Sequence, residues 1–248
     1  MKAVILAAGA STRLKELTHD IPKCLLKVGE TTIIDYQIKL LTSVGELRFR
    51  DIYVVGGYKV EKLGYLKNHG VSVIHNPKFR EFNNIYSFYL ANNFVDEDFI
   101  LFNGDTLIHP RILKSLVDSK DGTAFVVDNV KKLGEEEMKV LVKNNKIIRF
   151  GKEINPNFAY GEYIGLAKFS LEDAEIIFDR MRKLLKDGKT DIWYECAINY
   201  VLDKINAFTV HTHGLPWIEI DIPKDYEKTI AKVYPQISLR NVKVKKSV

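Results

Sequence analysis

The chain has 248 residues, of which 46% are hydrophobic and 28% are charged, a composition typical of a folded protein that can bury a full core. It carries 37 lysine and arginine residues against 32 aspartate and glutamate residues, but four of the basic residues lie in positions 235–248, where there is no acid. The remaining 33 basic and 32 acidic residues nearly cancel. This balance disfavours a nucleic-acid-binding protein, which needs a sustained cationic face.

Two cysteines, Cys24 and Cys196, are too few for a disulfide framework and are not spaced as zinc ligands. The apolar run at residues 3–8 is too short for the core of a signal peptide or for a membrane span. No later stretch approaches about 20 uncharged apolar residues. We therefore expect a cytoplasmic protein that does not insert into a membrane.

The first hundred residues alternate short apolar runs with amphipathic stretches. The predicted strands cover residues 3–8, 51–55, 71–74 and 99–102. The predicted helices between them cover residues 32–44, 60–66 and 84–94. This alternation predicts a parallel sheet with crossover helices.

Beyond Gly122 the pattern changes to short extended segments and three further helices. The predicted extended segments cover residues 123–127 and 140–142 and part of 158–169. The predicted helices cover residues 171–185, 193–202 and 226–233. Asn144 and Asn145 lie between apolar pairs, as the turn of a hairpin would. We expect one α/β domain over residues 1–234, with a mixed β extension in its second half and a basic tail over residues 235–248.

The first predicted strand runs into Ala8, Gly9 and Ala10, small residues that let backbone N–H groups approach a bound group closely. Arg13 adds a planar donor that is always charged. The glycine spacing is wrong for a dinucleotide-binding fingerprint. An anion-binding loop and an ordinary strand-to-helix turn are equal alternatives for this segment taken alone.

Lys23 follows Pro22, whose ring restricts the path of the chain and presents the lysine from a stiff loop. A lysine ammonium is a compact charge that suits the non-bridging oxygens of a phosphate. Alone, a lysine at such a place is most often a surface residue. Together with the loop at Gly9 it becomes a candidate second phosphate ligand.

Two aspartates are candidate magnesium ligands, because Mg²⁺ prefers hard oxygen atoms. Asp105 follows the apolar strand at residues 99–102, and ligands of open α/β sheets gather beyond the carboxyl ends of the strands. Asp221 lies just before Pro223, where a helix is expected to begin. The alternatives are a solvated turn for Asp105 and a helix N-cap for Asp221.

Taken in order, these motifs resemble the nucleotidyltransferases that make activated sugars and alcohols: a strand followed by LAAG and an arginine, then Pro-Lys, then a strand followed by Gly-Asp, and a late acidic residue before a C-terminal helix. The resemblance runs from Met1 to about Val233. The segments at residues 56–58 and 82–91 make the chain most similar to the cytidylyltransferases that act on phosphocholine and similar small phospho-alcohols. The resemblance implies a Rossmann-like fold of the nucleotide-diphospho-sugar transferase type, with a mostly parallel sheet.

The resemblance also implies a role for each motif. The residues implied at the nucleotide are Ala8, Gly9 and Ala10 through their backbone, Arg13 and Lys23 at the phosphates, and Gly57, Asn84 and Ser87 at the base. The residues implied as Mg²⁺ ligands are Asp105 and Asp221. The residues implied at the acceptor are Lys152, Glu162, Tyr163, Trp193, Tyr194 and Glu195. The sequence departs from the family at Ser11, where a glycine is frequent.

The acceptor site has two alternative interpretations. Tyr160 and the aromatic residues just named could form a box for a quaternary ammonium such as choline, although aromatic residues at this spacing are more often core. Glu162 and Glu195 could instead bind a primary ammonium or sugar-like hydroxyls. Lys152 is a candidate contact of the acceptor phosphate or, alternatively, a solvated residue of a hairpin.

The implied reaction is the Mg²⁺-dependent transfer of CMP from CTP to a small phosphorylated acceptor, with release of pyrophosphate. The candidate acceptors are phosphocholine, phosphoethanolamine, aminoethylphosphonate and inositol 1-phosphate. A phosphate dianion is already a nucleophile, so no general base is expected. Two alternatives stay open: a sugar-1-phosphate nucleotidyltransferase that uses UTP or dTTP, and a catalytically inactive nucleotide-binding module. The sequence does not decide the oligomeric state, with a homodimer as one alternative.

Overall fold

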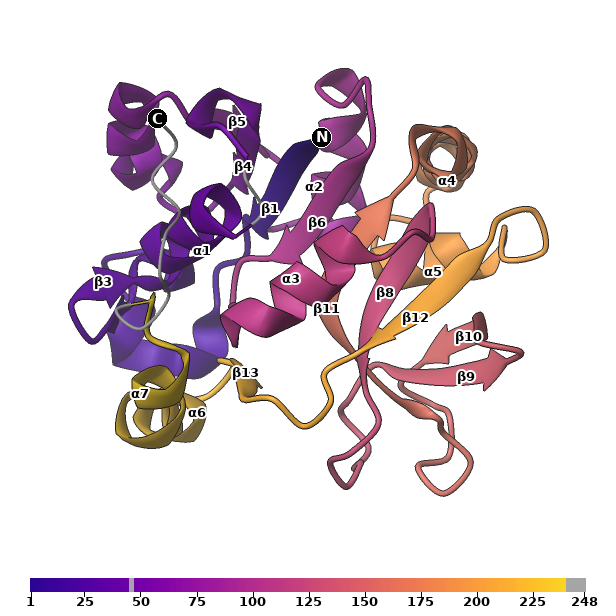
Figure 1. The fold of residues 1–248 in the computed structure, drawn as a ribbon. Coiled ribbons are helices and arrows are strands. Elements are labelled where there is room, and N and C mark those ends of the chain that lie inside the picture. The colour runs from indigo at the N-terminus through magenta and orange to yellow at the C-terminus, as the bar shows by residue number, and fades with distance from the viewer. Residues whose placement is uncertain (45–46, 240–248) are drawn as a thin grey trace, which may run out of the picture.

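A nine-stranded sheet runs through the protein in the computed structural model, which describes residues 1–44 and 47–239 (Figure 1). Its spatial order is β5-β4-β1-β6-β11-β8-β12-β10-β9. Its strands are β1 (Lys2–Ala7), β4 (Ile52–Gly56), β5 (Ser72–His75), β6 (Phe99–Asn103), β8 (Thr123–Asp128), β9 (Lys139–Lys143), β10 (Lys146–Gly151), β11 (Gly161–Phe169) and β12 (Ala207–His211).

Most strands of this sheet run in one direction. The pairs β1–β4, β4–β5, β1–β6 and β8–β12 are parallel, whereas β11 lies antiparallel between β6 and β8. The hairpin β9–β10 extends the far edge. Its turn residues Asn144 and Asn145 have φ angles of 51° and 59°, the left-handed pair that a type I′ turn requires. The α/β fold with a mostly parallel sheet and a mixed β extension is therefore confirmed.

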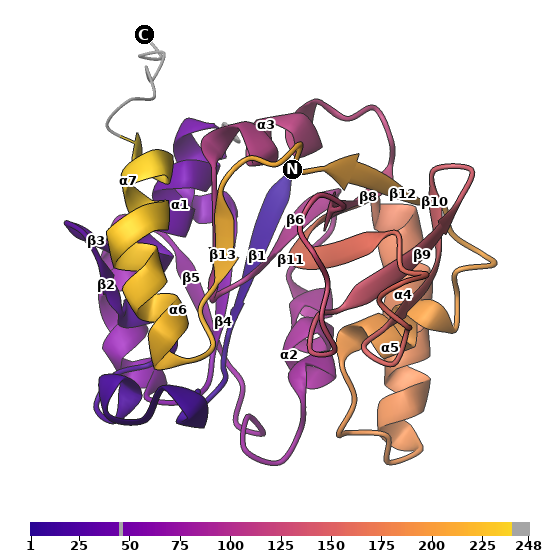
Figure 2. The same cartoon turned by 90° about the horizontal axis from the view of Figure 1, so that it is seen from below.

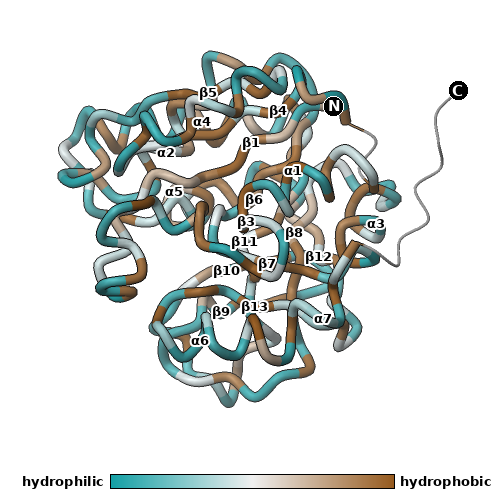
Figure 3. Tube along the Cα trace, turned by 90° about the vertical axis from the view of Figure 1, so that its left-hand side faces the viewer, coloured by the Kyte–Doolittle hydropathy of each residue, from teal (hydrophilic) through white to brown (hydrophobic). Residues whose placement is uncertain are grey.

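Helices cover both faces of the sheet (Figure 2). The helices on one face are α1 (Ile33–Ser43) and α3 (Pro110–Asp118), and those on the other are α2 (Asn84–Leu90), α4 (Leu171–Lys186) and α5 (Tyr194–Asn199). A hydrophobic core lies on each face of the sheet. Side chains of a strand point to alternate faces, so successive residues of β1 are buried in one core and then in the other. Ile5 packs with residues of α1 and α3, and Val4 packs with residues of α2, α4 and α5. Figure 3 shows the resulting hydrophobic strands inside a more hydrophilic shell.

Several predicted helices differ from the observed ones in type or length. The segment predicted at 60–66 is a 3₁₀ helix, Val60–His69, and the one predicted at 193–202 ends at Asn199. The segment predicted at 226–233 begins earlier, with Pro223 in the first turn. It is built of α6 (Pro223–Lys228), a π-helical turn (Thr229–Val233) and α7 (Tyr234–Ile237). No helix within the described residues is both long and apolar enough to span a membrane.

The C-terminal helices return to the first half of the chain. The Tyr226 hydroxyl donates to the carbonyl oxygen of Lys27 at 2.7 Å, and the Tyr36 hydroxyl lies 3.0 Å from the carbonyl oxygen of Ile237. Ile237 and Leu239 are buried in the same core as α1, so the first residues of the predicted tail pack with the domain. A domain boundary after residue 234 stays a prediction, and the tail's basic residues, from position 240 onward, lie outside the described residues.

Two short strand pairs complete the fold. The strands are β2 (Lys27–Val28) with β3 (Thr31–Thr32), and β7 (Thr106–Ile108) with β13 (Trp217–Glu219). The second pair is antiparallel and joins the end of the chain to the segment that follows β6.

Gln37 is a fully buried amide of α1 that supports this same segment. Its Nε2 donates to the carbonyl oxygens of Asn103 and Thr106, each at 2.8 Å. These two residues flank Gly104 and Asp105, so the amide of Gln37 holds the turn that presents the Asp105 side chain.

We expect the substitution Gln37→Met to lower the free energy of unfolding by about 2 kcal/mol, because two carbonyl groups in the protein interior lose their donor. Urea unfolding of both proteins measures the difference. Gln236→Met, at an exposed amide of α7, is the matched control and should change the free energy by less than about 0.5 kcal/mol. A change at Gln37 no larger than that of the control would contradict this role.

Candidate active site

A cleft of about 1060 Å³ opens beyond the carboxyl ends of β1 and β6. Segments that are far apart in the sequence line it, including residues 6–9, 103–105 and 215–219. A parallel sheet places the ends of its strands at one edge, which is where open α/β folds bind ligands. The cleft is therefore the place to look for the predicted site residues.

The loop after β1 presents open backbone to the cleft. Ala8 and Gly9 line the cleft, and a β-carbon built on Gly9 would have no atom of the described residues within 4 Å apart from those of its two chain neighbours. Ser11 has φ 49° and ψ 44°, the left-handed conformation that glycine adopts without strain. The serine thus keeps the turn for which the family often uses glycine, and a 3₁₀ segment (Thr12–Thr18) follows it.

Gly57 and Ala10 are not among the residues that line the cleft in the described structure. Gly57 instead supports the loop from behind, since a β-carbon there would lie 2.5 Å from the carbonyl oxygen of Ala8. That oxygen accepts a hydrogen bond from the backbone N–H of Tyr58 at 3.0 Å. Gly57 therefore lets its own loop approach the loop after β1 closely and does not itself contact the cleft.

A network of ion pairs joins Arg13, Lys23, Asp105 and Asp221 on the wall of the cleft. Lys23 Nζ lies 2.8 Å from Asp105 Oδ2 and 3.0 Å from Asp221 Oδ1, and it also donates to the carbonyl oxygen of Ile220 at 2.8 Å. An Nη atom of Arg13 lies 2.9 Å from Asp221 Oδ2. Because an ammonium has three N–H donors, these three contacts of Lys23 use all of them. We call these four residues the ion-pair cluster.

The charges in the ion-pair cluster stabilise one another. Burial disfavours the ammonium of Lys23, but the carboxylates of Asp105 and Asp221 outweigh that effect and raise the pKa of Lys23. Burial likewise disfavours the Asp221 carboxylate, yet Lys23 and Arg13 lower the pKa of Asp221. Lys23 and Asp221 are therefore charged at neutral pH.

The return of the chain at β13 brings Asp221 to Asp105. Glu219 pairs with Thr106 across β13 and β7, and the Ile220 N–H donates to the carbonyl oxygen of Asp105 at 3.1 Å. The Asp225 carboxylate then accepts hydrogen bonds from the N–H groups of Asp221 and Ile222, each at 3.0 Å. The side chain of Asp221 is thereby left for the cleft, instead of serving as an N-cap of α6.

Glu219 is a site residue that the motif analysis missed. Carboxylate oxygens of Asp105, Glu219 and Asp221 lie within 4.8 Å of one another, a set of hard oxygen ligands that suits a divalent metal ion. Although Glu219 keeps access to the solvent of the cleft, the surrounding protein and the two aspartates raise its pKa to about 8. The signal was present in the sequence, since residues 219 and 221 are two apart in an extended segment and point to the same side.

Two of the three predicted base-binding residues lie in the first half of α2. Asn84 and Ser87 both line the cleft. The Ser87 hydroxyl accepts a hydrogen bond from Asn76 Nδ2 at 2.9 Å, and Asn84 Oδ1 accepts one from the backbone N–H of Tyr194 at 2.9 Å. These bonds fix α2 to the sheet and to α5, so this wall of the cleft is already ordered.

The predicted aromatic residues do not assemble into a box. Tyr194 is fully buried, and its hydroxyl lies 3.0 Å from that of Tyr163. The Tyr160 hydroxyl is instead within hydrogen-bond distance, 2.9 Å, of His211 Nε2. Trp193 lines the cleft and is 39% exposed, but Lys152 Nζ lies over its ring, 5.0 Å from the centroid. Lys152 also lines the cleft.

Two glutamates line the cleft close to these aromatic residues. Glu162 and Glu195 are each only 4% exposed, and burial raises the pKa of each to about 7. Lys131 Nζ lies 2.5 Å from Glu162 Oε2, a pairing that no sequence pattern had indicated. Glu195 Oε2, by contrast, is buried without a hydrogen-bond partner among the described residues.

Known proteins are similar to this chain in both amino-acid sequence and fold. The chain is 33% identical to the CTP:phosphoglutamine cytidylyltransferase of Campylobacter jejuni, over 94% of this chain and 100% of that protein. It is 28% identical to the choline-phosphate cytidylyltransferase of Streptococcus pneumoniae, over 92% of this chain and 96% of that protein. A solved structure of the CTP:phosphocholine cytidylyltransferase from S. pneumoniae matches with a TM-score of 0.77 and 25% identity, over 92% of this chain and 97% of that one.

The profile of the MobA-like NTP transferase domain matches residues 3–147, more than half of the chain. That range holds the loop after β1, Lys23 and Asp105, whereas Asp221 comes from the segment beyond it. The resemblance to nucleotidyltransferases that the motifs predicted is thus confirmed. The chain belongs to the family of MobA-like NTP transferases and is a nucleotidyltransferase.

Proposed function

We propose that this protein transfers CMP from CTP to a small phosphorylated alcohol or phosphonate in the cytoplasm, with Mg²⁺ as cofactor and pyrophosphate as the second product. The observation that carries the proposal is the ion-pair cluster, which places two cations and two carboxylates beside the open loop at Gly9. Relatives named as cytidylyltransferases, similar over nearly their whole length, support CTP as the nucleotide. A cleft of about 1060 Å³ has room for a nucleotide and a small acceptor together.

The nucleotide would bind along the loop after β1. Ala8 and Gly9 line the cleft with open space beside Gly9, and their backbone N–H groups would suit phosphate oxygens. Arg13, whose side chain is 60% exposed, can turn from Asp221 to a phosphate without leaving the cleft. Asn84 and Ser87, at the start of α2, would then meet the base.

The residues present fit Mg²⁺. Asp105, Glu219 and Asp221 supply hard oxygen atoms within 4.8 Å of one another, and they already face a cation, the ammonium of Lys23. A bound Mg²⁺ would neutralise charge on the α-phosphate and so ease attack by an anion. We propose that Lys23 holds the place of this cation in the nucleotide-free protein and yields the two aspartates when metal and nucleotide arrive together.

In the reaction, a phosphate or phosphonate oxygen of the acceptor would form a bond to the α-phosphorus of CTP. The bond from that phosphorus to the bridging oxygen of the β-phosphate breaks, and pyrophosphate leaves with the electron pair. The nucleophile has no proton to lose, so this chain's residues need to position and neutralise two anions rather than act as a base. Lys23 and Arg13, released from the aspartates, would stabilise the charge on the leaving pyrophosphate.

The nucleotide preference can be tested by supplying each NTP with Mg²⁺ and a panel of acceptors, namely phosphocholine, phosphoethanolamine, 2-aminoethylphosphonate and inositol 1-phosphate, with glucose 1-phosphate for the sugar-nucleotide alternative. We expect pyrophosphate release with CTP at a kcat/KM at least about tenfold above that with UTP, dTTP, ATP or GTP, because a base pocket with fixed hydrogen-bonding groups discriminates between bases. Release only with UTP or dTTP and a sugar 1-phosphate would instead establish the sugar-nucleotide alternative. Binding of CTP with no turnover on any acceptor would establish an inactive module.

Substitutions in the ion-pair cluster separate an enzyme from such a module. We expect Lys23→Met and Asp105→Asn each to lower kcat by about 10²- to 10³-fold, the loss that follows removal of one charged group from a phosphoryl-transfer site. Circular dichroism should show a retained fold.

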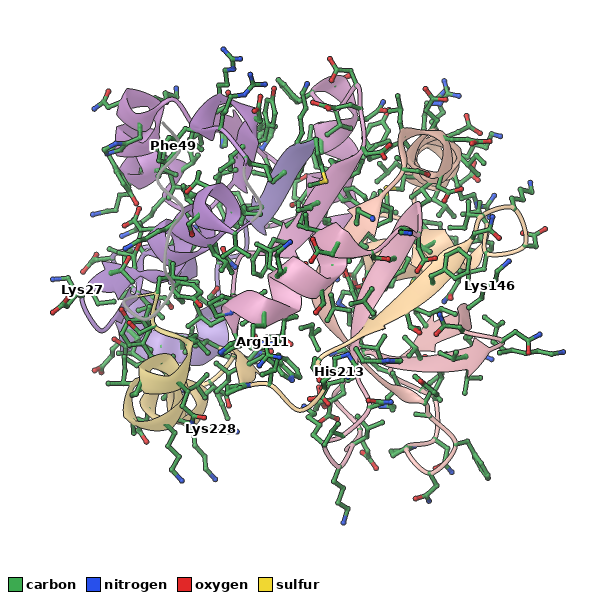
Figure 4. All side chains as sticks on the ribbon, in the orientation of Figure 1. Lys27, Phe49, Arg111, Lys146, His213 and Lys228 are labelled. Atoms are coloured by element: carbon green, nitrogen blue, oxygen red, sulfur yellow. The ribbon has the colours of Figure 1, made fainter. Side chains whose placement is uncertain are left out.

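Lys146→Met is the matched control for that experiment. This exposed lysine begins β10 and lies on the opposite side of the molecule from Lys27 (Figure 4). Its replacement should change kcat less than twofold. Full activity in Asp105→Asn would contradict the proposed site.

A further inference from the structure

The wall of the cleft formed by residues 128–195 is acidic. Its carboxylates are Asp128, Glu136, Glu137, Glu162, Asp191 and Glu195. Among the described residues of this wall, the lysines are Lys131 and Lys152. An acceptor that carries only negative charge would be repelled by this surplus of carboxylates, whereas an acceptor with a cationic end would be attracted.

Most of the buried acidic groups on this wall already have partners. Asp128 Oδ2 accepts a hydrogen bond from Trp217 Nε1 at 2.6 Å, and Glu162 is paired with Lys131 at 2.5 Å. Glu195 differs, because its buried Oε2 has neither a hydrogen bond nor an ion pair in the part of the chain that the structure describes. A buried polar atom without a partner is costly, so a ligand that donates a hydrogen bond here would bind favourably.

The aromatic side chains around Glu195 are not available for a methylated cation. Tyr194 and Tyr163 are buried and bonded to each other through their hydroxyls. The ammonium of Lys152 already lies over the ring of Trp193, 5.0 Å from its centroid. A quaternary ammonium needs open aromatic faces and donates no hydrogen bond. It would compete with Lys152 and leave Glu195 Oε2 unpaired.

We propose that the acceptor carries a primary ammonium and that Glu195 selects it by accepting a hydrogen bond from it at Oε2. This inference rests on the proposed function, since it names the chemical class of the acceptor in the same cleft. Glu195 is thereby a specificity-determining residue that touches the acceptor's cationic end, away from the bond that is made. Burial raises the pKa of Glu195 to about 7, although Tyr194 and the charge of Lys152 act in the opposite direction, and a cation bound at Oε2 would favour the ionised form.

Phosphoethanolamine and phosphocholine form a matched pair of probes, because they differ only in three methyl groups on nitrogen. With CTP and Mg²⁺, we expect kcat/KM for phosphoethanolamine to exceed that for phosphocholine by at least about tenfold, since the methylated nitrogen leaves a buried acceptor unpaired. Phosphocholine as the equal or better substrate would overturn the inference while leaving the proposed function in place. Inositol 1-phosphate as the better substrate would overturn it too, because hydroxyl groups and not a cation would then be selected.

The substitution Glu195→Gln keeps the shape of the side chain and removes its charge. We expect kcat/KM for phosphoethanolamine to fall by about tenfold or more, mainly through KM, and that for phosphocholine to stay within about twofold. Equal losses on both acceptors would show a merely structural role and overturn the inference. Calorimetric titration of phosphoethanolamine into both proteins gives a second readout that does not depend on turnover, with weaker binding expected in the variant.

Glu175→Gln, at an exposed position of α4 outside the cleft, is the matched control and should leave the ratio of the two acceptors unchanged. If no acceptor releases pyrophosphate from CTP, the proposed function fails and this inference fails with it. That outcome is distinct from a reversed acceptor preference, which removes the inference alone.

Discussion

The ammonium of Lys23 between the carboxylates of Asp105 and Asp221 is the interaction on which the cleft depends. Lys23 is separated from Asp105 by 82 positions and from Asp221 by 198. One side chain therefore ties together the segment that follows Pro22, the turn after β6 and the segment after β13. Two carboxylates at this distance would repel each other without a cation between them. In the proposed function, a nucleotide that arrives with a metal ion would displace the Lys23 ammonium from the two carboxylates, and the ammonium would then contact the phosphates.

The rest of the fold serves this arrangement. The parallel strands bring the loop at Gly9 and the turn at Asp105 to one edge of the sheet, and Gln37 holds that turn from the buried side. The chain then travels through the second half before β13 pairs with β7 and delivers Asp221. The same second half supplies the acidic wall, so in the proposed function different parts of one domain carry the nucleotide chemistry and the choice of acceptor.

The order of strands and helices was predictable because burial imposes clear periodicity, and Asp105 was predictable because strand ends in such sheets meet at one edge. Arg13, Lys23 and Asp221 were predicted from the order of the motifs along the chain, because each motif taken alone is only a weak signal of a site. The pairing of Lys131 with Glu162 was not predictable, since it depends on the path of a loop and not on any local pattern. For the aromatic residues the sequence favoured a core position, but it could not tell that Tyr194 would be buried where α5 begins while its neighbour Trp193 stays exposed.

The most direct test of the exchange at Lys23 is the affinity for Mn²⁺, a spectroscopic substitute for Mg²⁺, measured by electron paramagnetic resonance without nucleotide. If Lys23 holds the place of the metal ion, Lys23→Met should bind Mn²⁺ at least about tenfold more tightly than the unaltered protein, because the internal competitor for the carboxylates is gone. Addition of CTP should then raise the affinity of the unaltered protein far more than that of the variant. An equal or weaker affinity in Lys23→Met would contradict the account.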